Sequence, residues 1–142
     1  MIDINMKNKM NLMLPKEFGE KWVKALRSGD FKKCIGKLYK NGSYCALGVV
    51  GSINGVNNED LIMAGGNLQS YKFKDNLPEC FIKDEQQIQN IIFRLNDGIY
   101  EHQENNFKEE YNVEFLEHDE KSLKEYSFDE IADWIETNVK FV

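Results

Sequence analysis

Apolar residues recur at helical spacing in three stretches of this chain. Each stretch places large aliphatic or aromatic side chains three or four residues apart, which is typical of a helix with one buried face. These helices are expected over residues 15–27, 84–97 and 127–139. The last two begin with a capping-box pattern, in which Asp or Ser is followed three residues later by Gln or Glu. The pattern therefore predicts a mainly helical fold.

The apolar pattern changes between the first two of these helices. Residues 31–39 are interpreted as irregular or extended, and the Asn41-Gly42 that follows is typical of a β-hairpin turn. The uncharged run from Tyr44 to Gly51 favours a buried helix over a buried strand, and a short helix is expected at Leu61–Met63. The expected fold class is a small, mainly α single domain with a minor β-hairpin. An α+β fold is the alternative.

Length and composition agree with one folded domain. The 142 residues are 42% hydrophobic, which is enough for a core, and the longest apolar run is far shorter than the roughly 20 residues that cross a membrane. Residues 1–14 show no secretory signal pattern. We therefore expect a single domain over residues 1–142, located in the cytoplasm and without a membrane partner.

Charge divides the chain into two unequal halves. Residues 1–75 carry 12 basic and 7 acidic side chains, whereas residues 76–142 carry 6 basic and 17 acidic ones. The basic residues are densest from Lys16 to Lys40, which suits a small anionic ligand, although ordinary solvated faces are the alternative. An acidic protein with one basic stretch argues against general DNA binding. Residues 98–126 are polar and acidic and are expected to form an insertion.

The spacing of cysteine and histidine argues against a metal site. Cys34, Cys45 and Cys80 form no Cys-x-x-Cys pair, and His102 and His118 stand apart from them. Structural zinc sites draw their ligands from close pairs, so no metal and no other cofactor is expected. A disulfide framework is not expected in a cytoplasmic chain either. The three cysteines are interpreted as free thiols.

Cys45 is the candidate nucleophile of this chain. A cysteine at the start of a helix has its thiolate favoured by the helix dipole. A nucleophilic cysteine also needs a positioned base, and both histidines lie within residues 98–126. A buried structural cysteine is the alternative. The interpretation leans against an enzyme and leaves the question open.

A small anionic ligand is the alternative to catalysis. Trp22 could stack on a base, lysines could hold phosphates, and Asn96-Asp97 could donate or accept hydrogen bonds at the mouth of a pocket. The competing interpretations are core packing for Trp22 and Trp134, and a helix C-cap for Asn96-Asp97. The candidate ligand-binding residues are Trp22, Arg27, Lys33, Tyr44, Cys45, Asn96 and Asp97.

Five short motifs, spread along the chain, are shared in the same order with a group of other proteins. They are Trp22-x2-Ala25-Leu26-Arg27-Ser28-Gly29, Gly36-x-Leu38, Tyr44-Cys45-x-Leu47-Gly48-Val49, Leu95-Asn96-Asp97 and Phe128-x-Glu130-Ile131-Ala132-Asp133-x-Ile135-Glu136. Together they resemble a group of small, uncharacterised bacteriophage and prophage proteins over most of the chain. Members of the group often carry Gln in place of Lys33 and Cys in place of Ala46. They usually pass from Asn-Asp almost directly into the last helix, which supports an insertion at residues 98–126.

The resemblance implies a lineage and names no reaction. Small phage proteins sequester signalling nucleotides, counter host defence, inhibit host enzymes or modify a small substrate. The leading hypothesis is therefore a binding protein that sequesters an anionic, nucleotide-like molecule, such as an immune signal of the infected bacterium. The alternatives are a cysteine-dependent hydrolase or transferase centred on Cys45, and an acidic inhibitor that presents residues 101–136 to a host protein. Whether the protein forms a homo-oligomer is left open by the sequence.

Overall fold

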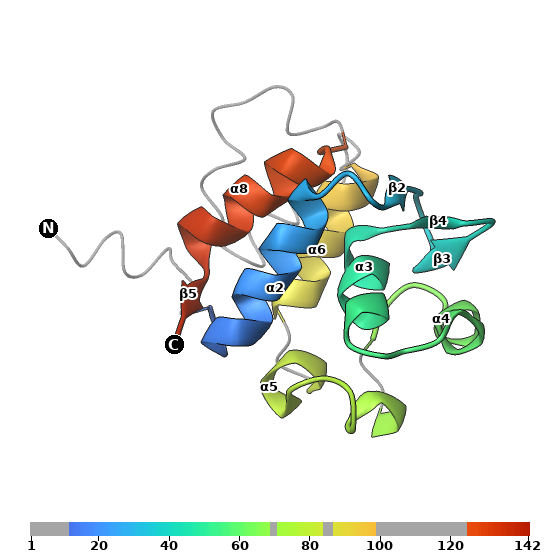
Figure 1. Ribbon diagram of the computed structural model, residues 1–142, viewed down its shortest axis with the longest axis horizontal. Coiled ribbons are helices and arrows are strands. Elements are labelled where there is room, and N and C mark those ends of the chain that lie inside the picture. Colours follow the sequence, from blue (N-terminus) through green and yellow to red (C-terminus); the bar gives the residue numbers. More distant parts are fainter. Residues whose placement is uncertain (1–11, 69–70, 84–86, 99–124) are drawn as a thin grey trace, which may run out of the picture.

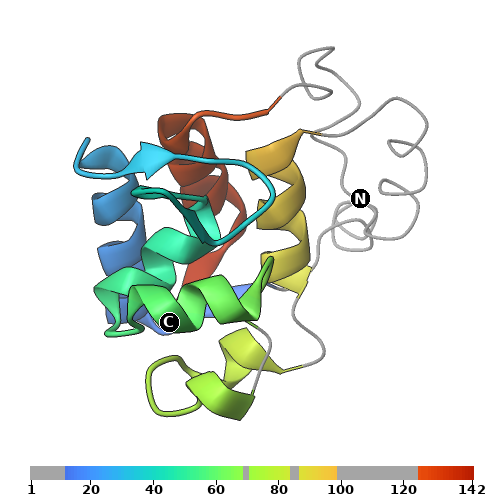
Figure 2. The ribbon, with the colours of Figure 1, turned by 90° about the vertical axis from the view of Figure 1, so that its right-hand side faces the viewer.

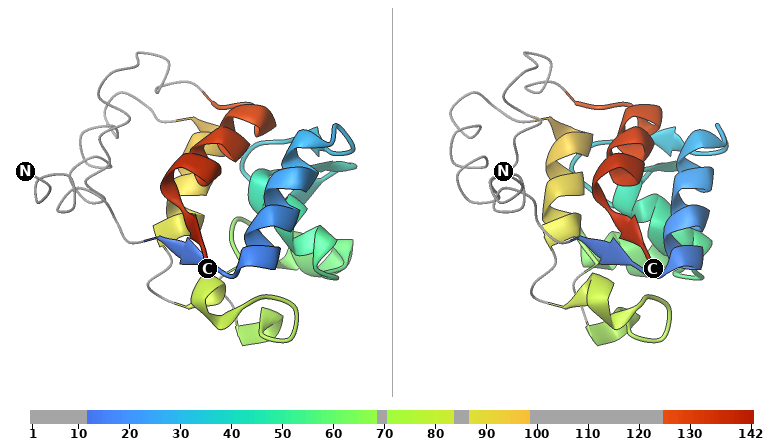
Figure 3. Two further views of the ribbon diagram at one scale, coloured as in Figure 1. Left: turned by 60° about the vertical axis from the view of Figure 1, so that its left-hand side comes forward. Right: turned by 90° about the vertical axis from the view of Figure 1, so that its left-hand side faces the viewer.

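Four helices form the body of the molecule. The computed structural model describes residues 12–68, 71–83, 87–98 and 125–142. The four helices are α2 (Lys16–Arg27), α3 (Ala46–Ile53), α6 (Gln87–Asp97) and α8 (Phe128–Asn138). Helix α2 packs against both α3 and α8, and α6 packs against the same two (Figure 1). The right panel of Figure 3 shows α6, α8 and α2 side by side.

Local signals in the sequence set the ends of these helices. Pro15 stands immediately before α2, and the buried face of that helix includes the expected Phe18, Trp22 and Leu26. Ser127 accepts a hydrogen bond from the Glu130 amide, and the Glu130 carboxylate accepts one from the Ser127 amide. The capping box predicted for the last helix is therefore confirmed. Asp84, the other predicted cap, lies outside the described residues.

A three-stranded sheet lies beside α3. Its strands are β2 (Lys32–Lys33), β3 (Tyr39–Lys40) and β4 (Ser43–Tyr44), in the order β2-β4-β3. Strands β3 and β4 are antiparallel and joined by the predicted turn, in which Asn41 and Gly42 have φ of 49° and 87°. Strand β2 pairs with β4 in parallel. Figure 2 views the molecule from the side on which this sheet lies.

A second pair of strands joins the two ends of the described body. Strand β1 (Met13–Leu14) runs parallel to β5 (Lys140–Phe141). The ring of Phe141 packs directly over Gly19 of α2, where a Cβ atom would lie 2.5 Å from Phe141 Cε1. The absence of a side chain at Gly19 therefore lets the ring of Phe141 lie directly on α2.

Smaller elements close one side of the core. They are α4 (Asn58–Ala64), the 3₁₀ turn η1 (Tyr71–Phe73) and α5 (Glu79–Ile82). From α5, Phe81 meets Trp22 edge to face at 5.5 Å between ring centroids. The uncharged run forms the buried helix α3, and the fold is mainly α with a minor β part, so both predictions are confirmed. Among the described residues, no helix has the length and apolar character needed to cross a membrane.

Candidate functional site

Several motif residues converge on the first turn of α3. Trp22 Nε1 donates to the Ala46 carbonyl oxygen at 3.1 Å, and Asn96 Oδ1 accepts from the Ala46 amide at 3.0 Å. Asn96 Nδ2 donates to the Cys34 carbonyl oxygen and to Asp97 Oδ1, both at 2.9 Å. Asn96 is fully buried. Its amide oxygen and nitrogen are both occupied within the protein, so this side chain ties α6 to α3 and to the segment after β2. Trp22 ties α2 to the same turn of α3.

Cys45 caps α3 from inside the core. Its Sγ accepts a hydrogen bond from the Gly48 amide at 3.4 Å, and the residue is 1% exposed. Burial raises the pKa of the Cys45 thiol to about 12, and the nearby Gly48 and Leu47 amides only partly offset this rise. The expectation that the helix start favours the thiolate is therefore wrong. The thiol is protonated at neutral pH, which does not favour Cys45 as a nucleophile.

Gly48 explains why this segment has no larger side chain. A Cβ atom at Gly48 would overlap the carbonyl oxygen of Leu38, and that same oxygen accepts a hydrogen bond from the Cys45 amide at 3.2 Å. The segment before β3 thus lies directly against the first turn of α3. The glycine in the Cys-x-Leu-Gly motif serves close packing of backbone on backbone.

Trp22 and Trp134 are both core residues. Trp22 has no exposed surface and contacts the rings of Phe18 and Phe81. Trp134 is 6% exposed. A ring that is covered on both faces cannot stack on a nucleobase, so the core-packing interpretation of Trp22 holds and the stacking alternative does not.

Two of the candidate cations already contact carboxylates. Arg27 pairs with Asp133 at 2.8 Å and Glu136 at 2.5 Å, which ties the end of α2 to α8. The hydrogen bonds that Arg27 donates, to Asp133 first and then to Glu136, raise the pKa of Arg27. Lys33 pairs with Glu125 at 2.5 Å, and its side chain is only 17% exposed. Neither side chain is free to meet a ligand without breaking an ion pair.

Tyr44 belongs to an aromatic cluster on the inner face of the sheet. Its ring lies 5.2 Å from that of Phe31 and 4.9 Å from that of Tyr39, and all three pack against the core. The Tyr44 hydroxyl donates to Asn58 Oδ1 at 3.2 Å. The register pairs Tyr44 with Tyr39 and with Lys33, so these three side chains share the inner face.

The opposite face of the sheet was not singled out from the sequence. The register pairs Ser43 with Lys32 on one side and with Lys40 on the other. Cross-strand partners point to the same face, so two lysines flank one serine there. Lys32 and Lys40 are exposed and Ser43 is half-buried. We call this set the outer sheet face. The hairpin turn could have placed Lys40 opposite Ser43, but no local signal brings Lys32 beside them.

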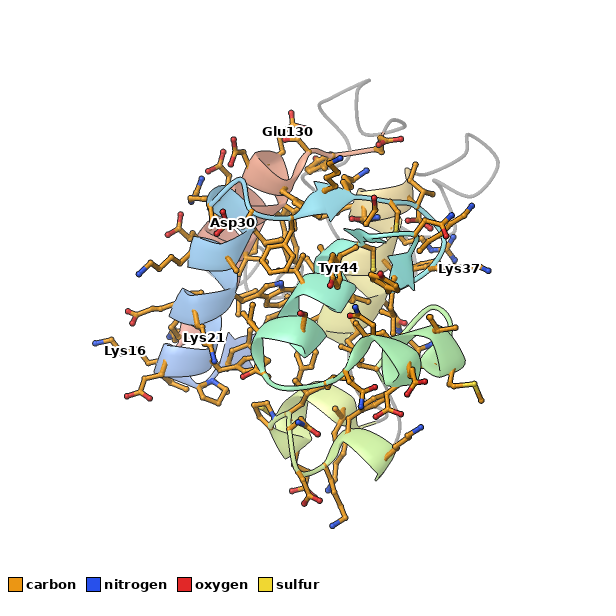
Figure 4. The ribbon with its side chains drawn as sticks, turned by 45° about the vertical axis from the view of Figure 1, so that its right-hand side comes forward. Lys16, Lys21, Asp30, Lys37, Tyr44 and Glu130 are labelled. Atoms are coloured by element: carbon orange, nitrogen blue, oxygen red, sulfur yellow. The ribbon has the colours of Figure 1, made fainter. Side chains whose placement is uncertain are left out.

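The basic stretch from Lys16 to Lys40 does not form one surface. Lys16 and Lys21 project from α2 on one side of the molecule, and Lys37 projects on the other from the segment between β2 and β3 (Figure 4). The lysines therefore divide between two sides. Within the part of the chain that the structure describes, no group of three or more His, Cys, Asp or Glu side chains could hold a metal ion. His102, His118 and most of the acidic segment 98–126 lie outside it.

The chain was compared with protein families, curated proteins and solved structures. The model of a family described as a domain of unknown function, DUF8296, matches residues 14–139. The chain belongs to this family. Every motif residue from Trp22 to Glu136 lies inside the matched DUF8296 domain, including those that meet at the first turn of α3. Neither the curated proteins nor the solved structures gave a match.

Proposed function

We propose that this DUF8296 protein binds a small phosphate-bearing, nucleotide-derived anion on its outer sheet face. The observation that carries the proposal is the strand register, which sets Lys32 and Lys40 on either side of Ser43. Neighbouring strands lie about 4.8 Å apart, so the Cα atoms of the two lysines are about 10 Å apart. Two long ammonium side chains at this separation can converge on one phosphate or contact two linked ones.

The electrostatics of the outer sheet face favour an incoming anion. Lys32 and Lys40 make no ion pair with any described residue, in contrast to Lys33 on the inner face. A phosphate can therefore meet both ammonium groups without displacing a carboxylate. The Ser43 hydroxyl between them can donate a hydrogen bond to a phosphate oxygen. The three residues that define this face include two lysines and no aromatic ring, so recognition would act through the phosphates and not through a base.

Binding without turnover fits the position of the candidate nucleophile. Cys45 is buried, with hydrogen bonds to the Leu38 carbonyl oxygen and from the Gly48 amide, and burial raises the pKa of its thiol to about 12. The outer sheet face presents lysines and a serine, and none of the described residues supplies a histidine to activate that serine. The proposed role is therefore capture of the ligand in unchanged form.

The resemblance to bacteriophage proteins suggests which anion this is. A phage product in the cytoplasm of an infected bacterium would meet signalling nucleotides that the host makes in defence. To sequester such a signal, the protein needs only to bind it tightly and to be present in excess over it. We therefore propose a signalling nucleotide as the ligand and an anti-defence role for its capture.

Calorimetry with matched lysine variants tests the proposal. Pyrophosphate, ADP and cyclic dinucleotides would be titrated into the wild type, into Lys32→Ala/Lys40→Ala and into Lys16→Ala/Lys21→Ala. The control pair loses the same charge from the other side of the molecule (Figure 4). We expect at least one phosphate compound to bind, and the sheet-face pair to lose about tenfold or more in affinity, which corresponds to about 1.4 kcal/mol. The control should keep its affinity.

Two outcomes would contradict this proposal. One is that none of these compounds binds to the wild type. The other is an equal loss in both lysine pairs, which would mean that binding depends on overall charge and not on the outer sheet face. Heat denaturation of the complex followed by mass spectrometry separates capture from catalysis. Intact ligand is expected, and a converted product would indicate an enzyme.

A further inference from the structure

Helix α4 presents an apolar surface that its own chain leaves exposed. Ile62 is 57% exposed and Met63 is 78% exposed, whereas Leu61 between α4 and the core is fully buried. Glu59 stands three and four residues before these two, so it shares their side of the helix. The exposed side of α4 therefore has an acidic group in its first turn and two large apolar groups in its last turn.

A lysine and a further apolar side chain lie beyond the end of α4. The Leu38 amide donates to the Gly65 carbonyl oxygen at 2.8 Å, and Gly66 lies beside the carbonyl oxygen of Gly36. The segment from Ile35 to Lys37 is thus held against the C-terminal end of the helix. Ile35 is 46% exposed, and Lys37 points away from the body at the edge of the sheet (Figure 4). We define the α4 surface as Ile35, Lys37, Glu59, Ile62 and Met63.

We propose that the α4 surface is the interface of a homodimer, in which two copies of α4 pack antiparallel about a two-fold axis. A two-fold interface must be complementary to itself. Antiparallel packing sets Ile62 and Met63 against the same residues of the second copy. It also brings the first turn of each α4 to the far end of the other, so each Glu59 faces the other copy's Lys37.

The charges of the α4 surface favour antiparallel packing of the two helices over parallel packing. Neither Glu59 nor Lys37 forms an ion pair with a described residue of its own chain, so both are open to a partner. Parallel packing would set Glu59 against Glu59, which is repulsive. Stable interfaces bury about 1,600 Å² in total. Five side chains on each copy bury less than that, so the dimer is weak and depends on concentration.

Sedimentation velocity of the full chain over a wide concentration range tests the dimer. We expect the weight-average mass to rise toward twice that of one chain as the concentration is raised. Met63→Asp and Ile62→Asp should each abolish this rise, since both residues are solvent-exposed and tolerate a charge when monomeric. Val142→Asp is the matched control, because Val142 is 66% exposed on the other side of the body, beside β5 (Figure 1). The control should associate like the wild type.

Charge exchange tests the antiparallel geometry. Glu59→Lys and Lys37→Glu should each weaken association, and the double variant Glu59→Lys/Lys37→Glu should restore it. Far-UV circular dichroism of each variant verifies that it is folded. A wild type that stays monomeric at every concentration would overturn the proposal. A Val142→Asp variant that fails to associate, or a double variant that does not recover, would overturn it as well. None of these substitutions touches Lys32, Ser43 or Lys40, so the outcome is independent of anion binding.

Discussion

At the scale of single residues, burial affects the pKa of the Cys45 thiol more than its position at the start of a helix does. A cysteine at a helix start gains stabilisation of its thiolate worth about 0.3–2 kcal/mol from the helix dipole. The Cys45 thiol lies in the core at 1% exposure, and burial raises its pKa from 9.0 to about 12. That rise corresponds to roughly 4 kcal/mol in favour of the neutral thiol. The dipole is present, but it is the smaller effect.

The raised pKa of Cys45 makes stability depend on pH in the alkaline range. Between pH 9 and about 12 the folded protein keeps the thiol proton, whereas the unfolded chain releases it. The contribution is therefore complete below pH 9 and is lost as the pH rises toward 12. Urea denaturation from about pH 8 to pH 10.5 should show the wild type losing up to about 1.4 kcal/mol per pH unit more than Cys45→Ala above pH 9. Equal slopes for the two proteins would contradict the buried, neutral thiol.

The sequence predicted the burial of individual residues better than their hydrogen bonds. Trp22 stands on the apolar stripe of a helix, so its place in the core follows from helical spacing alone. The bond from its Nε1 to Ala46 joins residues 24 positions apart, and Asn96 reaches the same residue from 50 positions away. Such contacts depend on how the helices pack. No local pattern predicts them: the sequence favoured a C-cap for Asn96-Asp97 over a ligand contact, and neither interpretation included the bond from Asn96 to Ala46.

At the scale of elements, α3 depends on close approach to the segment that leads into β3. Gly48 meets the carbonyl oxygen of Leu38, which is backbone and cannot move aside without disturbing the sheet. Gly51, one turn further on, would place a Cβ 3.1 Å from Leu61 Cδ2, the end of a side chain that can shift. The two glycines lie in the same helix and differ in what they face.

Substitution of these two glycines should give different results. Gly48→Ala should lower the free energy of unfolding by about 3 kcal/mol or more, because the new methyl group overlaps backbone. Gly51→Ala should stay within about 1 kcal/mol of the wild type, since better helix propensity offsets a small shift of Leu61. Chemical denaturation followed by circular dichroism measures both. A Gly48→Ala protein as stable as Gly51→Ala would show that the close approach is not essential.

Elements with strong local signals were predicted, and those that form through distant pairing were not. Pro15, the Asn41-Gly42 turn and the Ser127 capping box each act within a few residues, and the corresponding elements are present. Strand β2 has two residues and pairs in parallel with a strand 11 positions further on. A two-residue strand shows no periodicity, so its register, and with it the outer sheet face, could not be predicted.

At the scale of the whole molecule, charge along the chain differs from charge on the surface. The stretch from Lys16 to Lys40 is basic in sequence, yet α2 and the sheet direct its lysines to different sides (Figure 4). Arg27 and Lys33 are paired with acidic residues from the other half of the chain. On the outer sheet face, Lys32 and Lys40 form no ion pair with a described residue and lie on either side of Ser43. Of the lysines from Lys16 to Lys40, these two are the pair that the strand register sets on either side of one residue.

The motif residues and the proposed binding residues consequently form two separate sets. Trp22, Cys45, Gly48 and Asn96 hold the first turn of α3 in the core. Lys32, Ser43 and Lys40 lie on the outer sheet face. The central claim is that the first set builds the scaffold and the second binds the anion.

Affinity measured across both sets tests this claim most directly. Calorimetry with the best phosphate ligand would compare Cys45→Ala with Lys32→Ala/Lys40→Ala, each at a temperature where circular dichroism shows it folded. We expect Cys45→Ala to keep the wild-type affinity within about twofold and the lysine variant to lose about tenfold or more. Loss of binding in Cys45→Ala with full binding in Lys32→Ala/Lys40→Ala would contradict the claim and place the site at the first turn of α3.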